Sequence, residues 1–151
     1  MQLKVKRLTD TAVLPVKAHQ SDAGFDICAD MDITIDAGET VAVPTGLSIA
    51  IPDGYYGRLK GRSGLTAKTT LRVQEGTIDS DYRGEIKVIC DLRTLTGQGL
   101  KNLSFSSGYP IKQGQRIAQL IIQPLPPVDL VEVDDLDDTD RGDGGFGSTG
   151  V

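Results

Sequence analysis

The chain has 151 residues, of which 25% are charged and 5% aromatic, with no tryptophan and a formal net charge of −5. This length suits a single domain, whose core must be built mainly from Val, Ile, Leu and Ala. The negative charge argues against a protein that binds nucleic acid through its phosphate backbone, although a few local Arg and Lys side chains can still hold a small anion.

The sequence also bears on location. No run approaches the ~18 apolar residues of a membrane span, and the first residues lack the apolar block of a signal peptide. The two cysteines, Cys28 and Cys90, show no metal-binding spacing and favour a reducing compartment. We therefore expect a cytoplasmic protein that binds neither membrane nor nucleic acid.

Short segments in which apolar residues alternate with other residues recur along the chain and predict β-strands. In chain order they lie around residues 3–5, 33–35, 41–43, 47–51, 86–90 and 117–122. Turn signals such as Asp36-Ala37-Gly38 and Pro52-Asp53-Gly54 separate several of them. The best helix candidate is the short segment 63–68. This pattern predicts an all-β fold, either a barrel or a jelly roll, with at most one short helix.

Two regions depart from the strand pattern. Residues 91–112 are polar and rich in Gly and Ser, which is typical of a long hairpin with an exposed tip. From Glu132 to Asp143 there are seven carboxylates against one arginine, and residues 141–150 contain five glycines. We expect a β-domain over residues 1–131, followed over residues 132–151 by an acidic strap and a flexible, glycine-rich C-terminal arm.

The stretch Gly76-Thr77-Ile78-Asp79-Ser80-Asp81-Tyr82-Arg83-Gly84 has glycine at both ends, which predicts a bent, tightly held segment. A buried or half-buried Asp79 in such a place would be able to act as a general base. An Asp that caps an ordinary turn is the alternative, and these nine residues alone favour it.

Two further clusters carry polar groups. Gly61-Arg62-Ser63-Gly64-Leu65 combines backbone N–H groups, a hydroxyl and a guanidinium, as a phosphate cradle does. The alternative is a Ser63 N-cap beside a surface arginine. Ser21-Asp22-Ala23-Gly24-Phe25-Asp26 places Asp26 where it would face a hydrated cation, or else contains an ordinary turn at Asp22.

The glycine-rich tail imitates two nucleotide-binding motifs. Residues 142–147 fit G-x-G-x-x-G but leave no room for the helix that should follow, and Ser148 lacks the preceding lysine of a P-loop. The physical interpretation is an arm whose N–H groups wrap an anion, with Phe146 stacked on a flat ring. A disordered tail is the alternative.

Taken in order, the clusters resemble the five motifs of the trimeric dUTP pyrophosphatase (dUTPase) family. The five matching stretches are residues 21–29, 61–65, 76–84, Gly114-Gln115-Arg116-Ile117-Ala118-Gln119-Leu120, and 141–150. One match alone would be weak, but five in the right order over nearly the whole chain are specific.

The resemblance implies a distorted jelly-roll, β-barrel-like (β-clip) subunit and a homotrimer with sites at the subunit interfaces. It implies hydrolysis of dUTP to dUMP and pyrophosphate with Mg²⁺ on the triphosphate, which keeps dUTP out of DNA and supplies dUMP for thymidylate synthesis. Asp79 would orient and deprotonate the water that attacks the α-phosphorus. Asp26 would meet the metal only through water. The implied substrate-binding residues are Arg62, Ser63, Gly64, Gly76, Tyr82, Gln119, Arg141, Phe146, Gly147, Ser148 and Thr149.

The sequence departs from the family pattern in two places. Some members read uracil with an Asn side chain, but Val73-Gln74-Glu75 stands here, so base recognition would rest on backbone groups. Residues 91–112 are longer than usual, as a neutral insertion or a surface for a second partner. Two alternatives remain: a dCTP deaminase-like enzyme of the same fold, for which Glu75 would have to act at the base, or a non-catalytic regulatory β-protein.

Overall fold

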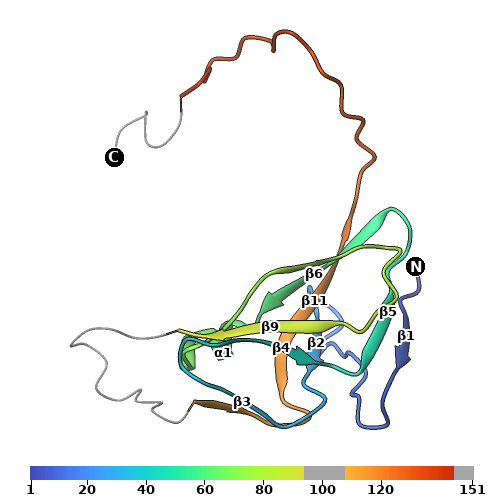
Figure 1. Ribbon diagram of the computed structural model, residues 1–151. Coiled ribbons are helices and arrows are strands. Elements are labelled where there is room, and N and C mark those ends of the chain that lie inside the picture. Colours follow the sequence, from blue (N-terminus) through green and yellow to red (C-terminus); the bar gives the residue numbers. More distant parts are fainter. Residues whose placement is uncertain (94–107, 145–151) are drawn as a thin grey trace, which may run out of the picture.

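The computed structural model describes residues 1–93 and 108–144, and Figure 1 shows them as a body of strands. The elements of this part are β1 (Lys4–Arg7), β2 (Phe25–Cys28), β3 (Ile33–Ile35), β4 (Thr40–Pro44), β5 (Leu47–Ala50), β6 (Tyr55–Gly61), α1 (Ser63–Lys68), β7 (Leu71–Val73), β8 (Gly76–Ile78), β9 (Lys87–Leu92), β10 (Tyr109–Ile111) and β11 (Arg116–Pro124). The predicted all-β class with one short helix is confirmed, and the arrangement is consistent with a jelly roll.

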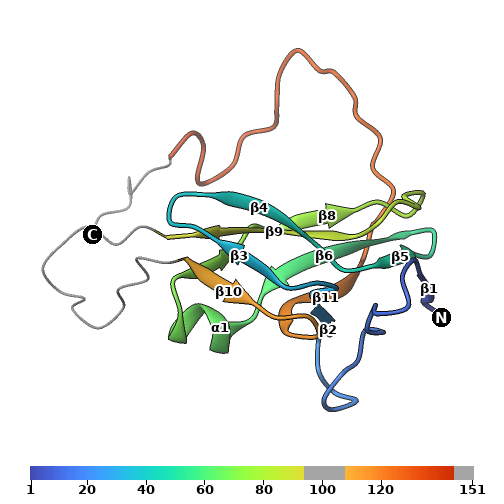
Figure 2. The same ribbon diagram turned by 60° about the horizontal axis from the view of Figure 1, so that its bottom comes forward.

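The strands form four small antiparallel sheets, in the orders β1-β5, β10-β3, β2-β11-β6-β8 and β4-β9-β7. The longest strand, β11, has nine residues and lies between β2 and β6. In Figure 2, β4 and β9 of the β4-β9-β7 sheet can be followed next to β6 and β8 of the four-stranded sheet. The chain passes between these two sheets at Gln74 and Glu75.

One cluster of buried aliphatic side chains connects the sheets. Along β9, Val88, Cys90 and Leu92 are buried while Lys87 and Ile89 are exposed, as expected for a strand with one face on the core. Gly57 in β6 fits against Leu120, because an added Cβ would lie 3.0 Å from its Cδ1. Glycine therefore allows β6 and β11 to pack closely.

The structure contains strands and strand pairings that the sequence did not predict. The strand β6, with glycine at two of its seven positions, is not among the predicted segments. Residues 91–112 do not form a simple hairpin at their base, because β9 pairs with β4 and β7 whereas β10 pairs with β3. Residues 94–107 lie outside the described part of the chain.

After β11 the chain leaves the body of strands and runs through residues 125–144, which contain no strand and are almost all exposed. Leu125 still donates its backbone N–H to Gly54 at 2.8 Å. Five apolar side chains farther along are more than half exposed: Val128, Leu130, Val131, Val133 and Leu136. Among the described residues, no helix has both the length and the apolar character needed to cross a membrane.

Candidate active site

A first pocket, of about 670 Å³, lies where β6 ends, α1 begins and β11 starts. Ser63 is the first helical residue and Arg62 is the N-cap, whose side chain makes no capping hydrogen bond. The alternative of a Ser63 N-cap is therefore wrong. The lining contains three cations, two hydroxyls and two side-chain amides but no carboxylate: Arg62, Ser63, Gly64, Leu65, Lys68, Thr69, Gly114, Gln115, Arg116 and Gln119. This composition suits an anionic ligand.

Asp26 lies behind this pocket and holds three of its side chains. The carboxylate is nearly buried; Oδ1 lies 3.1 Å from Arg62 Nε and 3.5 Å from Gln119 Nε2, and Oδ2 lies 3.3 Å from Arg116 Nη1. Two guanidinium groups thus share one buried carboxylate, which orients them and compensates part of their charge.

A β-bulge explains how Arg116 and Gln119 reach the same carboxylate. The register of β11 against β2 shifts between Arg116 and Ala118, which pair with the consecutive residues Cys28 and Ile27. In a regular strand, residues three apart point to opposite faces, and an extra residue reverses that relation. The bulge therefore brings both side chains to Asp26.

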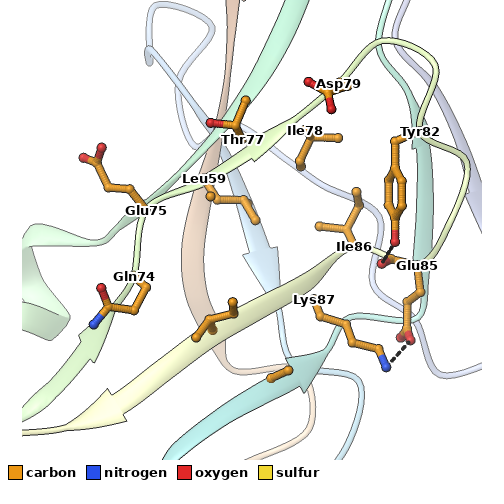
Figure 3. A pocket seen from close by; sticks show the side chains of 13 residues that line it. Leu59, Gln74, Glu75, Thr77, Ile78, Asp79, Tyr82, Glu85, Ile86 and Lys87 are labelled. Atoms are coloured by element: carbon orange, nitrogen blue, oxygen red, sulfur yellow. Dashed lines mark hydrogen bonds and ion pairs between the residues drawn. The ribbon is translucent and has the colours of Figure 1, made fainter.

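A second pocket, of about 520 Å³, lies between β8 and β9, which run in different sheets and leave a gap. Figure 3 shows Asp79 and Tyr82 at one end of this pocket and Gln74 and Glu75 at the other. Leu59, Ile78 and Ile86 provide apolar wall, and Gly76 adds backbone. A flat, largely apolar ring with polar edges fits such a cavity.

Asp79 directly follows β8, and its side chain is exposed in the single chain. Its backbone carbonyl accepts the N–H of Tyr82 at 3.3 Å, which closes the turn. Tyr82 Oη donates to the carbonyl oxygen of Glu85 at 3.1 Å. The loop therefore presents the carboxylate and the phenol at the rim of one pocket.

The two pockets share no lining residue and lie toward opposite ends of β6. Ile78, just before Asp79, pairs with Gly57 near the start of β6, whereas Arg62 follows its last residue. At about 3.3 Å per residue, Gly57 and Arg62 are separated by about 17 Å along the strand. A carboxylate and a phosphate cradle that act on one reacting atom must lie much closer together.

The predicted site residues thus fall into separate groups. Asp26, Arg62, Ser63, Gly64 and Gln119 are at the first pocket, and Asp79, Tyr82 and Gly76 are at the second. Arg141 lies in the exposed segment after β11, where its Nε donates to Gly144 O at 2.8 Å. Phe146, Gly147, Ser148 and Thr149 lie outside the described residues.

Sequence reasoning missed Arg116 and Lys68 at the first pocket and Glu85 and Ile86 at the second. Arg116 belongs to the matched stretch 114–120, but simple alternation gives no reason to place it beside Gln119. In the described ranges 1–93 and 108–144, no three or more His, Cys, Asp or Glu side chains form a group that could hold a metal ion.

Comparison with known proteins shows to which family the chain belongs. The family model described as dUTPase matches residues 10–150. The chain belongs to the dUTPase family. A deoxyuridine 5'-triphosphate nucleotidohydrolase of Paramecium bursaria Chlorella virus 1 is 44% identical over 149 residues, covering 99% of this chain and 98% of the viral protein. One from Arabidopsis thaliana is 47% identical over 148 residues, covering 98% and 82%.

Solved structures of dUTPases share the fold. A mutant of the Staphylococcus bacteriophage 80alpha dUTPase with dUpNHpp matches with a TM-score of 0.87 and 31% identity, covering 99% of each chain. A mutant of the dUTPase from phage phi11 of S. aureus matches with a TM-score of 0.80 and 29% identity, covering 89% of this chain and 98% of that one. The phi11 mutant structure reveals the coordination of a structural Mg(II) ion.

Proposed function

We propose that this dUTPase-family chain hydrolyses dUTP to dUMP and pyrophosphate, at a site that combines the two pockets from different copies of the chain. The observation that carries the proposal is the position of the pockets toward opposite ends of β6, one with an apolar cavity and a carboxylate, the other with cations. The reaction would keep dUTP out of DNA and supply dUMP for thymidylate synthesis, and we assign it to the cytoplasm.

Asp79 is the proposed general base, which orients a water in line with the α-phosphorus and takes its proton. Its exposure in the single chain leaves the carboxylate open to a water and to a second subunit. The bond from the α-phosphorus to the bridging oxygen breaks as the water attacks, and pyrophosphate leaves. Catalysis is then mainly positioning and charge neutralisation.

The first pocket is the proposed phosphate site. Arg62, Ser63 and Gln119 would hold phosphate oxygens, and Gly64 would add a backbone N–H. An added Cβ at Gly64 would meet nothing within 4 Å, so its backbone is approachable. Arg116, held at 3.3 Å by Asp26, adds a further cation at this surface.

The second pocket is the proposed base and sugar site. The backbone from Val73 to Gly76 would read the edge of uracil, and the apolar wall would leave no space for the methyl group of thymine. Tyr82 would pack on deoxyribose and exclude a 2'-hydroxyl, because its ring stands at the rim of the pocket. Phe146 of the C-terminal arm would cover the uracil ring.

Mg²⁺ is the proposed cofactor, carried by the triphosphate, and it would neutralise charge on the phosphates. The donors of the first pocket are cationic or neutral, so the metal's own ligands would come from phosphate oxygens and water. Asp26 fits the role of a carboxylate beside that water shell, because Oδ2 is engaged only by Arg116 among the described contacts and retains acceptor capacity.

A homotrimer is the proposed assembly. The five exposed apolar side chains between Val128 and Leu136 would be covered by a neighbouring subunit, since such a series is costly in water. Residues 132–151 would then act as strap and arm, with Arg141, Gly147, Ser148 and Thr149 around the terminal phosphates.

The deaminase alternative has less support. Glu75 Oε2 lies 2.7 Å from Arg58 Nη2, and Oε1 lies 3.5 Å from Lys60 Nζ. The hydrogen bond from Arg58 holds the pKa of the Glu75 carboxyl below its usual value. A carboxylate that is paired in this way and points away from the pocket in Figure 3 is poorly suited to proton transfer at a base.

The test is the release of pyrophosphate from dUTP, compared with dTTP, dCTP and UTP, with and without Mg²⁺, with ammonia release from dCTP measured in parallel. Magnesium-dependent release from dUTP alone is the expected result. Ammonia release would favour the deaminase, and no reaction with any nucleotide would favour a non-catalytic protein.

A further inference from the structure

The loop that carries Asp79 and Tyr82 rests on the turn between β4 and β5, which has no assigned role. Thr45 Oγ1 donates to the carbonyl oxygen of Ile86 at 2.6 Å, and the N–H of Ile86 donates to Leu47 O at 2.8 Å. The N–H of Gly46 donates to Glu85 Oε1 at 2.9 Å. Ile86 is therefore held through both its backbone N–H and its carbonyl oxygen, and Glu85 is held through its side chain.

The turn itself has little freedom to move. Thr45 is fully buried, and Gly46 has a φ of 64°, in the left-handed region that favours glycine. A Cβ at Gly46 would lie 2.5 Å from Thr9 Oγ1 and 2.7 Å from Asp30 Oδ2, and these two atoms are hydrogen-bonded to each other at 2.7 Å. The N-terminal segment thus packs directly on the turn, which makes it a fixed support.

The fastened peptide determines where the phenol of Tyr82 lies. Tyr82 Oη donates to the carbonyl oxygen of Glu85, the residue whose side chain is bound by Gly46. Figure 3 shows this bond beside the ion pair between Glu85 and Lys87, whose atoms lie 3.7 Å apart. A shift of Glu85 would carry the Tyr82 ring with it at the rim of the pocket.

We propose that Thr45 and Glu85 are positioning residues that set the Tyr82 ring at the sugar end of the pocket and thereby the preference for deoxyribose. This role deepens the proposed dUTPase function and rests on it. Thr45 lies outside the lining of the pocket and Glu85 belongs to it, and both are proposed to act through the backbone that holds Tyr82. Since these hydrogen bonds are buried or partly buried, their loss should displace the loop more than the loss of a surface contact would.

Two matched pairs of variants test the proposal. Thr45→Val removes the hydroxyl at nearly constant volume, whereas Thr45→Ser keeps it. Glu85→Ala removes the acceptor for Gly46, whereas Glu85→Gln keeps an oxygen there. For each folded variant, kcat and KM are measured with dUTP and UTP, and binding of the non-hydrolysable analogue dUpNHpp is measured by calorimetry.

Thr45→Val and Glu85→Ala are expected to lower the dUTP-to-UTP ratio of kcat/KM about tenfold, mainly through the KM for dUTP, and to weaken analogue binding to match. Thr45→Ser and Glu85→Gln should retain most of the dUTP-to-UTP ratio of kcat/KM. Lowered thermal stability with an unchanged ratio in the two disruptive variants would show a merely structural role and overturn the proposal. Absence of dUTP hydrolysis by the unaltered protein would overturn the proposed function together with this inference.

Discussion

The phenol oxygen of Tyr82 lies 3.1 Å from the carbonyl oxygen of Glu85, and the ring folds back over Gly84 to reach it. An ideal Cβ at Gly84 would lie 2.5 Å from Tyr82 Cζ, closer than real side chains approach. Glycine at position 84 therefore makes room for the aromatic ring. The position of the Tyr82 ring therefore depends both on its hydrogen bond to Glu85 and on the space left at Gly84.

Gly84→Ala should displace the Tyr82 ring and raise the KM for dUTP about tenfold, because a poorly placed ring costs on the order of 1 kcal/mol of binding. Steady-state kinetics with dUTP and UTP would measure the effect. Kinetics unchanged from those of the unaltered protein would contradict the steric role of Gly84.

A site shared between subunits predicts complementation. Asp79→Asn should bind the nucleotide but lose about 10²- to 10⁴-fold in kcat, as expected for a missing general base. Arg62→Ala should lose activity because its site no longer holds the phosphates of the nucleotide. When the two variants are unfolded and refolded together, about a quarter of the interface sites would contain both native residues. Recovered activity is the expected result; a mixture as inactive as its components would place the whole site in one chain.

Removal of residues 141–151 should leave the β-domain folded and the assembly intact, because the described contacts of Arg141 stay within its own segment. Turnover should fall strongly, since the arm would no longer cover the triphosphate. Circular dichroism, light scattering and kinetics would separate the effects. Full activity after truncation would contradict the role of the arm.

Asp26→Asn should lower the free energy of unfolding by about 1 to 3 kcal/mol, because the ion pairs of the carboxylate with Arg62 and Arg116 are lost. The Mg²⁺ concentration needed for half-maximal activity should also rise. Urea titrations and magnesium titrations measure the two effects. A fall in stability with an unchanged magnesium requirement would limit Asp26 to holding Arg62 and Arg116.

Alkaline pH should destabilise the fold through Cys90. Burial raises the pKa of this thiol from 9.0 to about 12, so its contribution is complete below pH 9 and is lost as the pH rises toward 12. The free energy of unfolding should fall by up to about 1.4 kcal/mol per pH unit in that window. Cys90→Ala should show a shallower fall in urea titrations between pH 9 and 11. An identical slope would show that other groups cause it.

The all-β class could be predicted because apolar alternation in segments such as 33–35 and 47–51 reflects the local two-residue period of a strand. The clusters around Arg62, Asp79 and Gln119 could be found in the same way, as combinations of residue types in short stretches. Strand partners could not: β9 and β10 flank one stretch of sequence yet belong to different sheets, since pairing depends on long-range packing.

The sequence alone therefore determined the class of fold, the short helix after Arg62 and the order of the chemical clusters, because each depends on neighbouring residues. Only the tertiary structure decided that Asp26 holds Arg62 and Arg116, that a bulge brings Arg116 beside Gln119, and that Thr45 supports the loop with Tyr82. It also separated Asp79 from Arg62 along β6. These relations depend on strand register and bulges, which join residues far apart in the chain and leave no local pattern.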